Sequence, residues 1–169
     1  MTRKKATLVV RLERLIPASP HAVYRAWLDP DLLRQWLAPG GFTVERAEVE
    51  ARVGGRYSIW HADAGADVGG FECEIVELVP GERIVFRWGF VGPDRTAGPV
   101  YDSLLTITLR TVSEDVTALT LVHARLDDLA AGLPHVADKV EVGWELVLEK
   151  LAIMLGAAGR RRTTSGRNA

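Results

Sequence analysis

Residues 137–157 read ADKVEVGWELVLEKLAIMLGA and contain the one long amphipathic pattern in the sequence. Large apolar residues recur there at intervals of three and four, which predicts a helix with a single apolar stripe. Gly156 and Gly159 are expected to end this helix. A stripe of this length has to be buried against another layer, so this segment limits the folds that the rest of the chain can adopt. The stripe comprises Val140, Trp144, Val147, Leu148, Leu151 and Met154.

The preceding region, residues 42–124, alternates apolar and polar side chains over short segments. A two-residue period predicts strands, and the short turns between them predict antiparallel pairing. Residues 62–70 contain three glycines and two aspartates and are expected to form a hairpin loop. Six strands are therefore predicted between the first 40 residues and the long helix.

The first 40 residues predict one strand and two short helices. Residues 6–14 alternate apolar and polar side chains, as a strand does. Ser19 followed by Pro20 is a start signal for a helix at 20–28, and a second helix is predicted at 31–37. The complete order predicts an α+β fold, in which a curved antiparallel sheet of six or seven strands wraps around the C-terminal helix.

Length, charge and cysteine count exclude several classes of protein. The 169 residues suit a single domain, which we expect at 6–158 with flexible termini at 1–5 and 159–169. A formal net charge of −1 gives no general attraction to nucleic acid, and no apolar run is long enough to span a membrane. One cysteine, Cys73, forms neither an intrachain disulfide nor a cysteine-rich zinc site. We expect a cytoplasmic monomer or homodimer.

The sequence offers little for metal binding or covalent catalysis. Only four histidines are present, and none has the spacing of a metal site or of a nucleophile with its base. His61 and Asp63 are close in sequence but lie in the expected hairpin loop, where a surface position is more common than a metal site. His123 continues the apolar alternation of its strand toward the sheet's concave face. It is either a ligand-contacting or acid/base group, or a structural histidine with a buried partner. We expect no metal, no cofactor and no identifiable catalytic residue.

Four stretches together resemble the helix-grip fold of the START-like (SRPBCC) superfamily, in the branch related to the activator of heat-shock protein 90 ATPase. Many members have two adjacent tryptophans where this chain has Trp36 and Leu37. That position lies near the mouth of the family's cavity, so ligand preference does not transfer to this chain. The four stretches are VYRAWLDPDLLRQW at 23–36, VGGRY at 53–57, PGERIVFRW at 80–88, and Gly143-Trp144 followed by Leu148 and Leu151.

The resemblance implies three functions of different classes. The first is a binding module for a small hydrophobic or aromatic ligand, held between the sheet and the C-terminal helix. The second is an interaction protein of the co-chaperone type, with a chaperone as partner. The third is an enzyme similar to polyketide cyclases, with His123 as its acid/base. One fold hosts all three, so the site has to decide between them.

Alternation along the strands and helical phase identify the side chains that face the interior. If they line a ligand cavity, its volume should be roughly 300–1,000 Å³. His123 should then be the main polar group that reaches the ligand, with Tyr57 second. The candidate ligand-binding residues are Trp36, Phe42, Tyr57, Ile59, Phe71, Ile75, Phe86, Trp88, Leu105, Ile107, Leu121, His123, Trp144, Val147 and Leu151.

Overall fold

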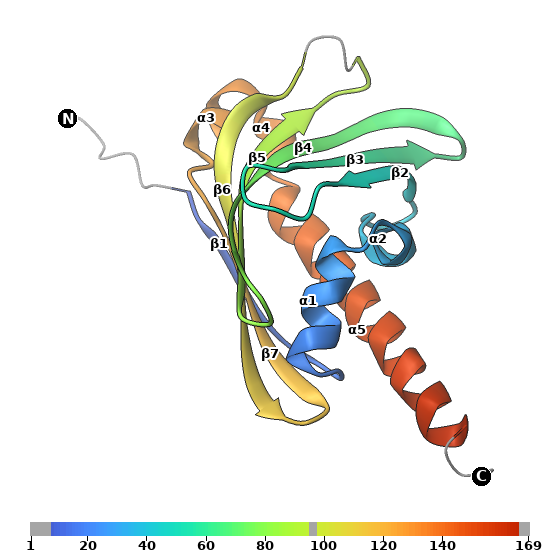
Figure 1. Cartoon of the computed structure of the whole chain (residues 1–169). Helices are drawn as coiled ribbons and strands as arrows, with labels where there is room; N and C mark the ends of the chain where they lie inside the picture. The colour runs from blue at the N-terminus through green and yellow to red at the C-terminus, as the bar shows by residue number, and fades with distance from the viewer. Residues whose placement is uncertain (1–7, 95–97, 166–169) are drawn as a thin grey trace.

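A seven-stranded antiparallel sheet curves around one long helix (Figure 1). The computed structural model describes residues 8–94 and 98–165, the last five of these as backbone only. The strand order β1-β7-β6-β5-β4-β3-β2 places the first strand beside the last and makes β1 and β2 the two edges. The strands are β1 Val10–Ile16, β2 Thr43–Val49, β3 Arg56–Asp63, β4 Ala66–Val79, β5 Arg83–Val91, β6 Val100–Ser113 and β7 Val116–Ala124.

The helices lie on the concave side of the sheet or at its end (Figure 1). The long helix α5 (Val140–Ser165) fills the curve of the sheet, and α1 (Pro20–Leu28) and α2 (Pro30–Trp36) lie beside it. Two further short helices, α3 (Asp127–Gly132) and α4 (Pro134–Ala137), connect β7 to α5. The structure confirms the predicted α+β helix-grip fold with its C-terminal helix and its two short helices after the first strand.

Local sequence signals place α1 and α2. Ser19 Oγ accepts a hydrogen bond from the backbone N–H of Ala22 at 3.3 Å, and Pro20 occupies the first helical position. Asp29 ends α1 and also caps α2, where its carboxylate accepts from the backbone N–H of Asp31 at 2.9 Å. One residue therefore ends one helix and starts the next, which fixes the sharp change of direction between them.

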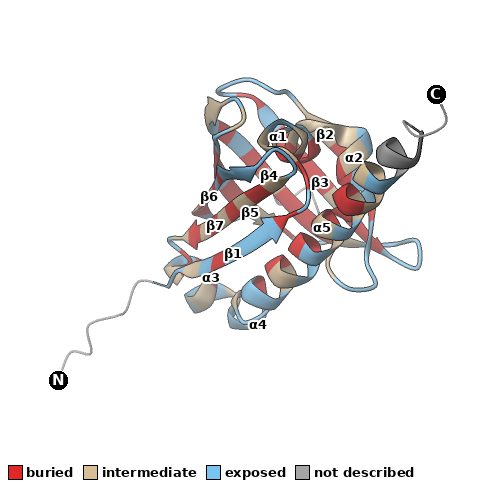
Figure 2. Ribbon diagram, turned by 90° about the horizontal axis from the view of Figure 1, so that it is seen from below, coloured by how far each residue is buried: buried red, intermediate tan, exposed pale blue. Residues whose placement is uncertain are grey.

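The core lies between the concave face of the sheet and the helices (Figure 2). Val147, Leu148 and Leu151 of α5 are buried against it, as the apolar stripe predicts. Cys73 is buried on β4, where burial raises the pKa of its thiol well above the ordinary value. A thiol of this kind stays protonated and takes part in packing rather than in chemistry.

Three sequence predictions are wrong in detail. Residues 62–70 do not form a loop, because β3 and β4 continue to a two-residue turn at Ala64 and Gly65. Both turn residues have positive φ, 49° and 85°, which matches the twist of a tight hairpin. The long helix starts at Val140 rather than 137 and continues to Ser165, so Gly156 and Gly159 lie inside it.

The two short helices between β7 and α5 were not predicted. Each has six residues or fewer, which is too short to show a helical period in the sequence. Of the predicted flexible termini, residues 159–165 belong to α5, while 1–5 and 166–169 lie outside the described residues.

Candidate functional site

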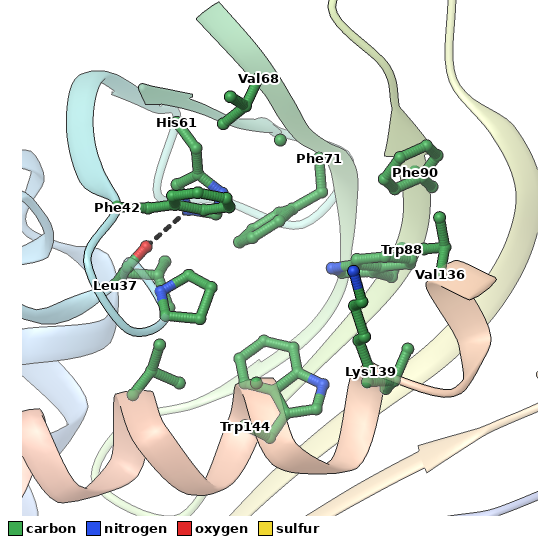
Figure 3. A pocket seen from close by; sticks show the side chains of 15 residues that line it. Leu37, Phe42, His61, Val68, Phe71, Trp88, Phe90, Val136, Lys139 and Trp144 are labelled. Carbon is green, nitrogen blue, oxygen red and sulfur yellow. Dashed lines mark hydrogen bonds between the residues drawn. The ribbon is translucent and has the colours of Figure 1, made fainter. Parts of the chain in front are cut away.

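A cavity of about 180 Å³ lies between the start of α5 and the ends of β3, β4 and β5 (Figure 3). Five aromatic residues line it, and His61 and Lys139 are the charged or titratable residues of the lining. Its volume is below the range of roughly 300–1,000 Å³ that the sequence analysis expected. The aromatic residues are Phe42, Phe71, Trp88, Phe90 and Trp144, and Leu37, Pro39, Val68, Val136, Val140 and Val147 complete the apolar lining with Gly70 and Gly143.

One face of the first turns of α5 forms the floor of the cavity. Gly143 and Trp144 lie three and four residues after Val140, and Val147 lies four and three residues after them, so all four are on the same side of the helix. Gly143 has no side chain there, and a Cβ atom at this position would lie 3.9 Å from Cβ of Pro39. That distance is an ordinary contact, so the glycine leaves space that a larger side chain would occupy.

The aromatic rings are packed against one another around the remaining space. The centroid of Phe71 lies 5.6 Å from that of Trp88 and 6.3 Å from that of Trp144. The ring of His61 meets Phe71 edge to face at 5.7 Å. These distances are typical of favourable aromatic pairs, so the wall is held in place without a ligand.

The loop after α2 forms one lip of the cavity and is fixed from two sides. Lys150 Nζ on α5 donates hydrogen bonds to the carbonyl oxygens of Ala38 and Gly40, the latter at 2.8 Å. His61 Nε2 on β3 lies 2.8 Å from the carbonyl oxygen of Leu37 (Figure 3). A carbonyl can only accept, so Nε2 of His61 bears the proton in this bond. Phe42, 37% exposed, completes the lip.

His123 lies behind the cavity wall in a chain of hydrogen bonds that runs from Trp144 to the backbone of Trp88. Trp144 Nε1 donates to His123 Nδ1 at 3.0 Å, so the neutral imidazole has its proton on Nε2. Nε2 lies 2.7 Å from Ser103 Oγ, which in turn donates to the carbonyl oxygen of Trp88 at 3.2 Å. Burial lowers the pKa of His123 from 6.5 to about 3.

This chain of bonds has a chemical consequence. A general base would need a free lone pair on Nε2 to take the Ser103 proton, but Nε2 already bears a proton. His123 and Ser103 are therefore not arranged as a nucleophile and its base. The imidazole instead fixes the orientation of the Trp144 ring and thereby one wall of the cavity.

The structure divides the predicted ligand-binding residues into two groups. Phe42, Phe71, Trp88, Trp144 and Val147 line the cavity. The others do not line it, and neither of the expected polar groups does: His123 binds Ser103 and Trp144, and the hydroxyl of Tyr57 donates to the carbonyl of Trp27 at 2.7 Å. The predicted residues outside the cavity lining are Trp36, Tyr57, Ile59, Ile75, Phe86, Leu105, Ile107, Leu121, His123 and Leu151.

Several cavity residues were missed by the sequence analysis. His61 was expected on the surface, but it is buried on β3 and follows Tyr57 and Ile59 at two-residue intervals. That alternation is visible in the sequence and was the signal that places His61 on the inward face of the strand. Phe90 similarly follows Trp88 on β5. Lys139 lies in the predicted helical segment 137–157, just before the observed start of α5, but it is not part of the apolar stripe and was therefore not identified.

Residues 8–94 and 98–165 contain neither a metal-binding cluster nor a membrane-spanning helix. No group of three or more metal-ligating side chains is close enough there to hold an ion. No helix in these ranges is long and apolar enough to cross a membrane.

Comparison with known proteins gives the family. The sequence model of the family described as Activator of Hsp90 ATPase homolog 1-like protein matches residues 17–156. A protein of solved structure from Chromobacterium violaceum is 33% identical, with a TM-score of 0.70 over 88% of this chain and 98% of that chain. No curated protein matches the chain.

Two more distant solved structures show the same fold. An AHSA1 protein from Silicibacter pomeroyi is 22% identical, with a TM-score of 0.73 over 89% of this chain and 99% of that chain. An HSP90 activator from Plasmodium falciparum is 23% identical, with a TM-score of 0.63 over 88% of this chain and 96% of that chain. Together with the match over residues 17–156, these likenesses lead to one conclusion: the chain belongs to the family of Activator of Hsp90 ATPase homolog 1-like proteins.

Proposed function

We propose that the cavity binds a small, largely apolar molecule with an aromatic ring. The observation that carries this proposal is an open space of about 180 Å³ inside a wall of five aromatic side chains. A cavity of roughly 150 Å³ with an apolar lining holds one benzene ring. The space here therefore suits a single ring, with the remainder of the ligand directed toward the exposed lining residues, among them Phe42 and Lys139.

The polar groups of the site favour binding over covalent chemistry. His123, the acid/base of the enzymatic hypothesis, does not line the cavity and has both ring nitrogens in hydrogen bonds. His61 uses Nε2 to hold the lip at Leu37. A mostly apolar wall with a few polar groups that fix the ligand's orientation is typical of a small-molecule binding site.

Calorimetric titration with propylbenzene tests the proposal. We expect saturable binding at one site, and we expect Gly143→Leu to abolish it because the new side chain enters the cavity next to Pro39. Gly159→Leu is the matched control, since it changes the same helix at a position where a Cβ meets nothing within 4 Å. Absence of binding to the wild-type protein, or equal binding by both variants, would contradict the proposal.

Contact with a chaperone of the Hsp90 class is a second candidate function. It is favoured by the family to which the chain belongs and by the similarity to an HSP90 activator from Plasmodium falciparum. The measurement is the ATPase rate of purified Hsp90 with and without this protein. A raised rate that persists in Gly143→Leu would show that the two functions use different parts of the molecule. An unchanged rate at micromolar protein would remove this candidate.

A further inference from the structure

The cavity contains an indole N–H that has no acceptor. Nε1 of Trp88 is buried without a hydrogen-bond partner, and Trp88 lines the cavity. Figure 3 shows this nitrogen on the cavity side of the ring. A buried donor without an acceptor destabilises a protein, so such groups are usually paired in the functional state. The unpaired N–H identifies a point where a ligand acceptor would be stabilised.

The other tryptophans clarify what is unusual about Trp88. Trp144 lines the same cavity, but its N–H is bonded to His123 and points away from the space (Figure 3). Trp36 donates to the carbonyl of Ala26 at 3.1 Å. Trp27 also has an unpaired buried N–H, but it is not part of the cavity lining. Among the described residues, only Trp88 combines an unpaired indole N–H with a place in the cavity wall.

A positive charge lies at the same cavity. Lys139 is exposed and lines the opening, and it forms no ion pair with any residue that the structure describes. None of the residues described in the lining is acidic. Lys139 and Trp88 both line this one cavity, and Figure 3 labels both side chains. The site therefore offers two kinds of donor, one charged and one neutral, and no carboxylate to occupy them.

We propose that the ligand is a small aromatic carboxylate, with its ring against the aromatic wall and its carboxylate shared by Lys139 and the N–H of Trp88. This inference rests on the proposed binding function and names the class of ligand. A carboxylate has two oxygens with several acceptor positions, so it can accept from both donors at once. The Lys139 side chain is exposed, long and flexible, so its amine can follow a carboxylate bound at the cavity. Because Nε1 of Trp88 is buried, the side chains around it have to move apart for an oxygen to reach it.

Three probes with the same ring and chain separate the parts of the proposal. They are 3-phenylpropanoate, its neutral amide 3-phenylpropanamide, and propylbenzene, which has no acceptor. For the wild-type protein we expect the carboxylate to bind about fivefold more tightly than the amide at low salt. This preference should shrink between about 10 mM and about 1 M salt, because Lys139 is exposed and screened. Both polar probes should bind more tightly than propylbenzene.

Two variants test which donor is responsible for the tighter binding of each polar probe. Lys139→Gln should remove the preference for the carboxylate over the amide, whereas Arg56→Gln, an exposed charge outside the cavity lining, should retain it. Trp88→Phe keeps a ring in the wall but has no N–H. This variant should lower the affinity for the carboxylate and for the amide several-fold more than the affinity for propylbenzene. Propylbenzene serves as the internal control for altered packing.

The outcomes distinguish failure of this inference from failure of the proposed function. Equal affinities of the carboxylate and the amide for the wild-type protein, with propylbenzene still bound, would overturn the inference and leave the binding function intact. The same holds if Lys139→Gln retains the carboxylate preference. If none of the three probes binds, the proposed function is wrong and the inference falls with it.

Discussion

The two halves of the interior contain the same kinds of side chain but pack them differently. Around α1 and the middle of α5, Trp27, Tyr57 and Phe86 are buried in continuous contact, with ring centroids of Tyr57 and Phe86 only 4.7 Å apart. Around the start of α5, Phe71, Trp88 and Trp144 enclose a space of about 180 Å³. We call these regions the closed half and the open half.

The comparison shows that aromatic content does not decide where a cavity forms. In the closed half, the helices α1 and α2 cover the sheet, and the hydroxyl of Tyr57 reaches the backbone of Trp27 at 2.7 Å. In the open half, Gly143 presents no side chain toward Pro39 of the lip, and Lys150 ties the lip to α5 by hydrogen bonds. A missing side chain and a fixed lip therefore preserve space that large rings alone would fill.

The largest difference between the halves should appear on truncation of one phenylalanine in each. Phe86→Ala should lower the free energy of unfolding by about 3–5 kcal/mol, because it removes a fully buried ring and leaves a void. Phe42→Ala should lower it by less than about 1 kcal/mol, because the ring is 37% exposed at the lip. Denaturant unfolding measures both values. Similar losses for the two variants would show that the halves are packed alike.

The pH dependence of stability tests whether His123, behind the wall of the open half, is shielded from solvent. Its pKa is about 3 when folded and 6.5 in the unfolded chain, so only the unfolded state binds the proton between these values. The folded protein is therefore most stable well above pH 6.5, where His123 is neutral in both states, and it loses stability progressively as the pH falls toward 3. Between pH 6.5 and 5.5 the loss should be about 1 kcal/mol.

The control for this prediction is His123→Gln, which has no titrating ring at this position. The variant's free energy of unfolding will be lower at every pH. Its slope against pH between 6.5 and 5.5 should be smaller than that of the wild type by the contribution of His123. An unchanged slope in the variant would mean that His123 is accessible to protons in the folded protein, contrary to its buried position.

Loss of Lys150 should affect the open half more than the closed half. Lys150→Met removes the hydrogen bonds to the carbonyls of Ala38 and Gly40 but keeps an apolar stem. We expect a stability loss of about 1 kcal/mol and several-fold weaker binding of propylbenzene, because the lip loses its anchor on α5. Arg56→Met, which removes an exposed cation outside the cavity lining, is the control, and its stability and propylbenzene affinity should be nearly unchanged. Wild-type affinity in Lys150→Met would contradict a role for the lip.

The smallest expected effect concerns the space beside α5. Gly143→Ala should raise the free energy of unfolding by up to about 1 kcal/mol, since alanine favours a helix and its Cβ would make only an ordinary contact with Pro39. The same methyl group narrows the cavity and should lower the affinity for propylbenzene. Gly159→Ala should give a similar stability gain with no change in affinity. A loss of stability in Gly143→Ala would show that this region is already closely packed.

The sequence was sufficient to predict the fold because the strands, the two helices after the first strand and the long helix each have a local signal, whereas the missed helices α3 and α4 only connect β7 to α5. Alternation identified the strands, and Ser19 with Pro20 identified the first helix start. The cavity was only partly predictable, since inward direction does not reveal whether neighbouring rings meet. Phe86 and Trp88 alternate identically on β5, yet only Trp88 lines the space.

The features of the site that were not predicted depend on contacts between distant parts of the chain. The hydrogen bond from Lys150 to Ala38 joins residues 112 positions apart, and no periodic pattern predicts it. The same is true of His123, whose alternation correctly placed it on the concave face but did not reveal its bonds to Ser103 and Trp144. Its polar atoms are used within the protein rather than for a ligand.

The five tryptophans allow one direct measurement of the division between the halves. Each indole N–H gives a separate signal in a ¹⁵N–¹H correlation spectrum, and single Trp→Phe variants assign the signals. Trp88 and Trp144 report on the open half, Trp36 on the closed half, and Trp60 on the opposite face of β3, where the guanidinium of Arg46 lies 5.0 Å from its ring. On titration with propylbenzene, we predict saturable shifts of the Trp88 and Trp144 signals, with Trp36 and Trp60 unmoved. Equal shifts of all signals, or no shift of Trp88 and Trp144 at saturating propylbenzene, would contradict a ligand site confined to the open half.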